Sequence, residues 1–190
     1  MQSACGGRPA RYVYVTPSHS APCLLRQRST LDADQNQPLK LWVDADACPV
    51  AIKEILFRTA ERLRVETILV ANQSISIPPS DVIRRVTVRD GADVADNRIV
   101  EWMQPGDVVI TGDIPLAARV VDGGGVAIGT RGELYDDASV HGRLAARNLM
   151  EQFRAAGMET SGPKPLSQKD VQTFANQLDR TLTRALKRAN

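Results

Sequence analysis

The sequence predicts a three-layer α/β/α fold with a mainly parallel sheet, and two observations support this fold class. First, short apolar runs alternate with amphipathic segments from residue 40 onward, a pattern typical of a parallel sheet that helices cover on both faces. Second, two of the apolar runs end in a carboxylate that a proline soon follows, and proline is common in the first turn of a helix. A chain of 190 residues, 43% of them hydrophobic, is long enough for one domain with a full core.

The elements of this α/β domain follow from the spacing of the apolar residues. Strands are expected at residues 40–44, 66–71, 83–88, 107–111 and 125–128. Helices are expected at about 49–64, 94–103 and 115–122. The first helix has the i, i+3, i+4, i+7 spacing of one buried face, carried by Ile52, Ile55, Leu56, Thr59, Ala60 and Leu63. Pro49 fits the first turn of this helix, where its missing N–H leaves no hydrogen bond unmade.

Two longer helices are expected after residue 137, at about 138–156 and 167–188. Ser167 and Asp170 resemble an N-cap with an acidic third position. The last helix carries one apolar face, formed by Val171, Phe174, Leu178, Leu182 and Leu186. The expected organisation is a poorly ordered extension over residues 1–38, an α/β domain over 39–156, and a helical segment packed on that domain over 157–190.

The distribution of charge suggests what the chain binds. Residues 39–139 contain 11 basic and 16 acidic side chains, whereas residues 140–190 contain nine basic and four acidic ones. Carboxylates concentrated in the middle of the chain suit a cation site. Arginines concentrated at its end suit either a polyanion or a solvated helix face.

Several other classes of site are disfavoured. Three cysteines without metal-ligand spacing argue against a disulfide framework and against a structural zinc site. The two histidines, His19 and His141, are too few for an imidazole-dependent triad or a histidine-rich zinc site in the folded part. No run approaches 18 apolar residues and the start lacks a secretory signal, so we expect no membrane segment and a cytoplasmic location.

Acidic residues follow two of the predicted strands and begin a predicted helix. Asp44 and Asp46 follow the first strand, and Asp113 follows the strand at 107–111. Asp93 and Asp96 begin the helix at 94–103. In a doubly wound sheet these segments meet at the carboxyl edge, where open α/β sheets bind ligands. Each acid also has a plainer interpretation: a helix cap for Asp93 and Asp113, a first-turn acid for Asp96, and turn solvation for Asp46.

Carboxylates gathered without Cys or His predict a hard divalent cation, Mg²⁺ or Mn²⁺. Such an ion lowers the pKa of bound water and neutralises charge on a reacting phosphate, so the expected reaction is phosphodiester hydrolysis without a histidine base. The expected metal ligands are Asp44, Asp46, Asp96 and Asp113, with Asp44 and Asp113 as the catalytic pair. The expected supporting residues are Asn72 and Thr111, which would orient water or phosphate, and Asp93. A helix N-terminus lowers the pKa of a thiol, but Cys48 has no histidine partner and is disfavoured as a nucleophile.

The residues resemble one family in particular, the YaiI/YqxD family of bacterial proteins of unassigned function. The matching stretches are WVDADACPVAIKEILFRTAER, LVANQ, GADVADNRIV, GDVVITGDIPLA and SQKDVQTFANQLDR, which together cover about residues 40–183. The resemblance implies a PIN-like fold, the fold of a group of metal-dependent nucleases, and it implies RNA as the nucleic-acid partner.

In the PIN-like pattern, acidic residues stand after the first strand, within a central helix and after a later strand. Asp44, Asp96 and Asp113 match these places in order, and Asp46 is an addition of the YaiI/YqxD family. Candidates for a further carboxylate are Asp122 and Asp136. Members of the family start near Lys40, so a mis-assigned translation start is one explanation of the extension.

Two alternatives remain open. The Asp44-Ala45-Asp46 segment also matches the nucleophile and acid/base pair of haloacid-dehalogenase-type phosphatases. That scheme needs a lysine before its final acidic motif, and no lysine occurs between Lys53 and Lys164. The second alternative is a nucleic-acid or protein-binding module that keeps the fold without turnover.

Overall fold

The computed structural model describes residues 38–88, 91, 93–157 and 164–189. The strands are β1 (Lys40–Asp44), β2 (Glu66–Ala71), β3 (Ile83–Thr87), β4 (Val108–Ile110), β5 (Val126–Ile128) and β6 (Leu134–Tyr135). The helices are α1 (Val50–Leu63), α2 (Val94–Trp102), α3 (Ile114–Asp122), α4 (Asp137–Ala155) and α5 (Gln168–Ala189). The expected extension lies outside the described residues except for residue 38.

The strands form one sheet in the order β3-β2-β1-β4-β5-β6. The first five strands are parallel to one another, and β6 pairs antiparallel with β5. This confirms the predicted fold class. Every element expected from the sequence is present, and no end differs by more than one residue from the expected one. The sequence missed β6, because a two-residue strand is too short to show an apolar pattern.

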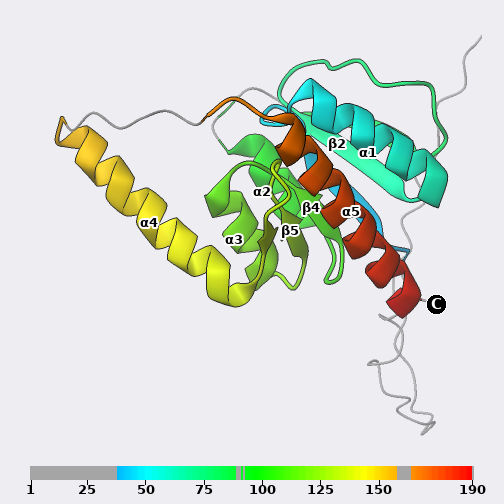
Figure 1. Cartoon of the computed structure of the whole chain (residues 1–190). Helices are drawn as coiled ribbons and strands as arrows, with labels where there is room; N and C mark the ends of the chain where they lie inside the picture. The colour runs from blue at the N-terminus through cyan, green and yellow to red at the C-terminus, as the bar shows by residue number, and fades with distance from the viewer. Residues whose placement is uncertain (1–37, 89–90, 92, 158–163, 190) are drawn as a thin grey trace, which may run out of the picture. The chain divides into compact units, whose positions relative to one another are not determined.

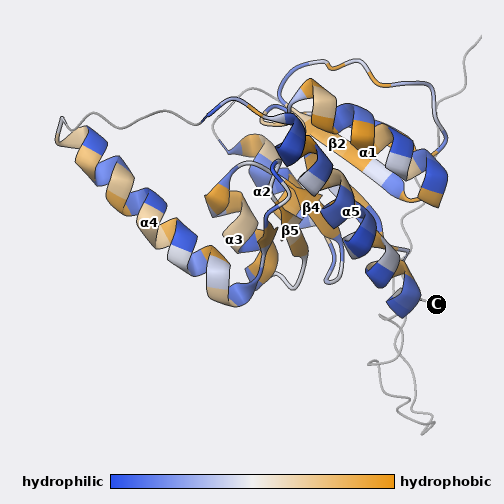
Figure 2. Cartoon of the chain, viewed as in Figure 1, coloured by the Kyte–Doolittle hydropathy of each residue, from blue (hydrophilic) through white to orange (hydrophobic). Residues whose placement is uncertain are grey.

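Helices cover both faces of the sheet (Figure 1), as expected from the unbroken apolar run Leu41-Trp42-Val43 in β1. Leu41 and Val43 point into a core shared with α1 and α5, whose Phe174 is fully buried. Trp42 points into a second core, shared with α2 and α3. The labelled strands carry mostly apolar residues, whereas α1 and α5 alternate between polar and apolar ones (Figure 2).

The order of the strands creates a switch point between β1 and β4. The chain winds from β1 outward through β2 to β3, then returns to the other side of β1 with β4. At such a point the connections that leave the two strands go to opposite sides, which opens a crevice at their carboxyl ends. Asp44 ends β1, and Asp46 and Asp113 lie in the segments that follow β1 and β4.

Gly132, in the turn between β5 and β6, lies against the backbone of α5. Its φ is +85°, and a Cβ there would lie 2.7 Å from the Phe174 nitrogen and 2.8 Å from the Thr173 carbonyl carbon. We therefore expect Gly132→Ala to lower the free energy of unfolding by about 2–3 kcal/mol through overpacking and backbone strain. Denaturant unfolding measures this change. Gly142→Ala is the matched control, because a Cβ there meets no atom within 4 Å. Equal stability of the two variants would contradict the expectation.

Candidate functional site

Asp44 is the buried acid at the switch point. It is the last residue of β1 and only 5% exposed. The Thr111 hydroxyl, just past β4, donates a hydrogen bond of 3.0 Å to Asp44 Oδ2. Burial is the main cause that raises the pKa of Asp44 above its ordinary value, and the nearby Asp46 and Asp113 raise it further. The Thr111 hydrogen bond lowers this pKa, because it stabilises the ionised carboxylate. The same bond fixes the orientation of the Asp44 side chain.

Asp113 is tied to the same threonine. The backbone N–H of Asp113 donates to Thr111 Oγ1 at 2.9 Å. Asp113 also caps α3, because its Oδ2 accepts a hydrogen bond of 3.1 Å from the Leu116 N–H. The capping role that the sequence allowed is therefore real. Because that bond uses Oδ2, it is compatible with a second role for the same carboxylate.

Asp96 shows that these acids share one region of the molecule. It lies half-buried in the first turn of α2. Its pKa is raised to about 6, mainly by burial and then by the charges of Asp44, Asp113 and Asp93. The side chain of Asp93 makes no capping hydrogen bond, although Asp93 occupies the N-cap position of α2 with a φ of 60°. The pKa of Asp96 therefore indicates that Asp44, Asp93 and Asp113 lie near enough to act on it through their charges.

The raised pKa of Asp96 predicts a gain in stability when its charge is removed. The folded pKa lies above the unfolded one, so ionisation of Asp96 destabilises the fold as the pH rises from about 4 through 6. In metal-free buffer we expect Asp96→Asn to raise the free energy of unfolding by about 1 kcal/mol at pH 7, after allowance for solvent screening of a half-exposed group. The gain should vanish near pH 4. Urea unfolding at both values tests this, and a loss of stability at pH 7 would contradict it.

Asp46 and Asn72 join the ends of β1 and β2. Asp46 is exposed, and its Oδ2 accepts a hydrogen bond of 2.7 Å from the Asn72 backbone N–H. Within the part of the chain that the structure describes, the side-chain oxygen of Asn72 is buried and has no hydrogen-bond partner. An unsatisfied buried acceptor is unfavourable by about 1–3 kcal/mol, so this oxygen calls for a donor or a cation.

Among the described residues, no lysine or arginine pairs directly with the proposed ligands at this edge, although the charge of Arg119 lowers the pKa of Asp96. Over residues 38–88 and 93–157, neither Asp44, Asp96 nor Asp113 forms an ion pair with a lysine or arginine. Among the described residues, the three carboxylates do not bring one oxygen each to within 4.8 Å of one another. The donor set fits Mg²⁺ or Mn²⁺, because such ions take oxygen ligands, and Mg²⁺ keeps several waters while binding one or two carboxylates directly.

Two residues near this edge were not found from the sequence. Tyr135 in β6 is 6% exposed, and its pKa is raised by burial, by Glu133 and, more weakly, by Asp113. The guanidinium of Arg143 lies 5.5 Å from the centre of the Tyr135 ring. Tyr135 and Glu133 therefore border the acidic edge on the β5 side. Because β6 has only two residues, no periodicity indicated them.

Cys48 is a buried thiol. Burial raises the pKa of Cys48 to about 12, so the thiolate is not populated at neutral pH. This agrees with the sequence analysis, which disfavoured a nucleophilic cysteine. Asp136, a candidate for a further carboxylate, instead forms a capping box with Ser139 at the start of α4.

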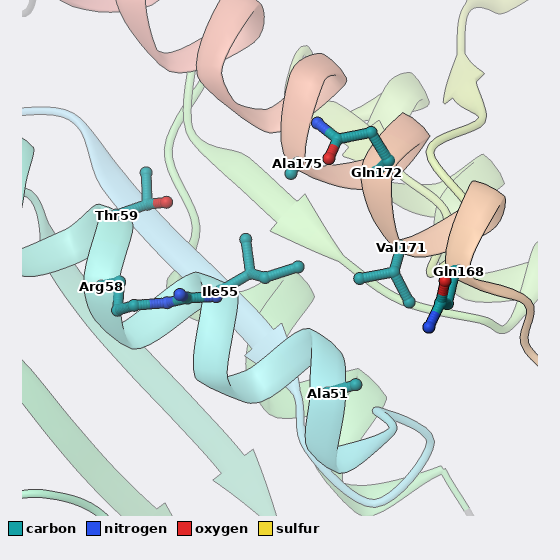
Figure 3. A pocket seen from close by; sticks show the side chains of 8 residues that line it. All are labelled: Ala51, Ile55, Arg58, Thr59, Gln168, Val171, Gln172 and Ala175. Carbon is teal, nitrogen blue, oxygen red and sulfur yellow. The ribbon is translucent and has the colours of Figure 1, made fainter.

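An open groove of about 560 Å³ lies elsewhere, between α1 and α5 (Figure 3). It is lined by Ala51, Ile55, Arg58, Thr59, Gln168, Val171, Gln172 and Ala175. None of these residues is acidic, and none belongs to the switch-point site. The groove therefore contributes no acid or base to the chemistry of that site.

Comparisons with known proteins found relatives of this chain. A family model described as "Uncharacterized BCR, YaiI/YqxD family" matches residues 42–184. A UPF0178 protein of Pseudoalteromonas translucida is 58% identical over 145 residues, which are 76% of this chain and 96% of that protein. A UPF0178 protein of Halorhodospira halophila is 56% identical over 146 residues, 77% of this chain and 97% of that protein. No solved structure matches the chain significantly. Of the helices in the described residues, none has the length and apolar character needed to cross a membrane.

Proposed function

The chain belongs to the YaiI/YqxD family, whose description assigns no activity, and from this premise we propose that it is a divalent-metal-dependent nuclease that hydrolyses phosphodiester bonds, with RNA as its substrate. The proposal rests on the switch-point site and on the PIN-like order of its acidic residues along the chain. The preference for RNA over DNA comes from the resemblance to PIN-like nucleases alone.

One observation carries the proposal: carboxylates from three separate segments share one electrostatic environment, and within the described residues none of Asp44, Asp96 and Asp113 forms an ion pair with a lysine or arginine. Asp96 has a pKa of about 6 because Asp44, Asp113 and Asp93 act on it in addition to burial. Selection for stability alone would favour neutral or paired groups at these positions. A bound divalent cation would offset the repulsion between these carboxylates, and this would account for their grouping at one edge of the sheet.

The acids proposed to hold the ion, directly or through its bound waters, are Asp44, Asp96 and Asp113, with Asp46 and the buried Asn72 oxygen at its border. When bound, Mg²⁺ or Mn²⁺ would supply a water of lowered pKa and neutralise charge on the phosphate. Thr111 holds Asp44 through its hydroxyl and Asp113 through the backbone N–H, so it fixes the spacing of two proposed ligands.

Cationic side chains at the border of the site suit a phosphodiester substrate. Arg119 of α3 donates a hydrogen bond of 2.8 Å to Asn97 Oδ1 and lies close enough to Asp96 to lower its pKa. Arg143 stacks on Tyr135 on the β5 side. A guanidinium group can bind two phosphate oxygens through two parallel N–H bonds. These two positions are the proposed contacts for the nucleic-acid chain.

The proposal is tested with full-length protein and two measurements. Calorimetry with MnCl₂ measures whether an ion binds, and a labelled single-stranded RNA reports cleavage with Mn²⁺ and with EDTA. We expect Mn²⁺-dependent cleavage that EDTA abolishes. Absence of ion binding up to millimolar Mn²⁺ would refute a metal-dependent activity. Salt-sensitive RNA binding without cleavage would favour a binding module, and phosphate release from a small monoester would favour a phosphatase.

A further inference from the structure

A second group of ligand atoms lies where α3 ends and α4 begins. Asp122 is the last residue of α3, and Asp137 and His141 lie one helical turn apart on α4. His141 Nε2 lies 3.2 Å from Asp122 Oδ1 and 3.6 Å from Asp137 Oδ1. Among the described residues, this is the one set of three such side chains whose ligand atoms all lie within 4.8 Å of one another.

These side chains stand on a rigid support. The capping box of Asp136 and Ser139 fixes the first turn of α4, which carries Asp137. Val140, next to His141, is fully buried in the core that α3 shares. Because both helices are held by this core, the three ligand atoms approach one another without any need for a loop to reorganise.

The separations fit metal coordination. Ligand atoms about 2.1 Å from a tetrahedral ion lie about 3.4 Å from one another, between the two separations measured from His141 Nε2. A charge-assisted hydrogen bond would be shorter, about 2.7–2.9 Å. Both contacts are within ion-pair distance, and among the side-chain hydrogen bonds of the described residues none joins the imidazole to Asp122 or Asp137.

We propose that Asp122, Asp137 and His141 form a binding site for a transition-metal ion of the Zn²⁺ class. An imidazole nitrogen with two carboxylate oxygens favours Zn²⁺, Co²⁺ or Ni²⁺ over Mg²⁺. All three side chains are exposed, so water completes the coordination.

This site is distinct from the switch-point site. Asp113 caps the start of α3 and Asp122 ends it, and a helix of nine residues is about 14 Å long. An ion at this site would join α3 to α4 near the start of the longer helix. Beyond that junction α4 becomes exposed, including Leu149, Met150 and Phe153. The proposed role is therefore to fix the direction in which α4 leaves the domain.

The test is calorimetry of tag-free full-length protein with ZnCl₂. Wild type is compared with His141→Ala and Asp122→Asn, which change exposed side chains. Glu151→Gln is the matched control, because it removes an exposed carboxylate from the same helix. The chain has only two histidines, so the His141 ring resonances can be assigned by comparison with His141→Ala. They report whether Zn²⁺ reaches the imidazole.

We expect a binding event, separate from any Zn²⁺ bound at the switch-point site, that His141→Ala and Asp122→Asn each weaken at least about tenfold and that Glu151→Gln leaves unchanged. The event should persist in Asp44→Asn protein, which separates it from the switch-point site. Wild-type binding that His141→Ala leaves unchanged would overturn the proposal. So would absence of binding at millimolar Zn²⁺, unshifted His141 resonances, or loss of the event in Asp44→Asn protein.

Discussion

Replacing Asp44 with Asn is expected to lower Mn²⁺-dependent RNA cleavage at least about 100-fold while the protein stays folded. The amide keeps the size of the carboxylate and can still accept the hydrogen bond from Thr111. It removes the charge that would bind the ion. Because burial already raises the pKa of Asp44, the metal-free variant should be no less stable than wild type.

Asp113 allows the catalytic role to be separated from the structural one. Asn is as good an N-cap as Asp, so Asp113→Asn should keep the cap of α3 and lose only the charge. Asp113→Ala should lose activity and also about 1 kcal/mol of the free energy of unfolding. If capping were the only role of this residue, Asp113→Asn would remain fully active.

The measurement for these variants is the rate of cleavage at fixed Mn²⁺, together with thermal unfolding of each protein in EDTA. Asp81→Asn is the control, since Asp81 is an exposed acid in the segment before β3. Full activity of folded Asp44→Asn protein would refute the assignment of this residue as a ligand.

Asp107→Ala is expected to have the largest effect on stability, a loss of about 3–5 kcal/mol. Asp107 is 4% exposed and stands immediately before β4. Its carboxylate accepts hydrogen bonds of 3.0 Å from the Lys40 N–H, 2.9 Å from Trp42 Nε1–H and 2.9 Å from the Gln104 N–H. Alanine would leave three donors without their partner, and one of them is the indole of a core tryptophan.

Denaturant unfolding in EDTA measures this loss. Asp107→Asn should be intermediate, because its amide oxygen can accept hydrogen bonds but its NH₂ group would face a donor. Trp42→Phe removes the indole bond and also shrinks a buried core side chain, so its loss of stability combines the two effects. A change below about 1 kcal/mol for Asp107→Ala would show that these hydrogen bonds do not stabilise the junction of β1 and β4.

The sequence was sufficient for the class of fold, and it indicated several residues of the candidate site. Strand ends followed by proline pointed to Asp44 and Asp113, because the carboxyl edge of a parallel sheet collects such residues. The sequence did not decide which of the acids cap helices. Capping was a valid alternative for both Asp93 and Asp113, and the structure shows that only Asp113 makes the capping bond with its side chain. This difference depends on backbone angles that composition does not reveal.

Other residues needed the tertiary structure. Tyr135 and Glu133 come from a strand and turn too short to carry a pattern, and they reach the acidic edge only because β6 pairs with β5. Asp122 was a candidate for the edge of the sheet, but it ends α3 close to His141 instead. The two ends of a helix are separated by its length, so Asp122 at the end of α3 lies away from Asp113 at its start.

By itself, then, the sequence determined the alternation of strands and helices, the two buried faces and the acids that follow the strands. These properties depend on periodicity and neighbouring residues, which a single chain displays directly. Only the tertiary structure decided that β1 lies beside β4, that Asp96 shares the field of Asp44 and Asp113, and that His141 meets two carboxylates. These contacts join residues far apart in the chain, so they depend on strand order and helix packing.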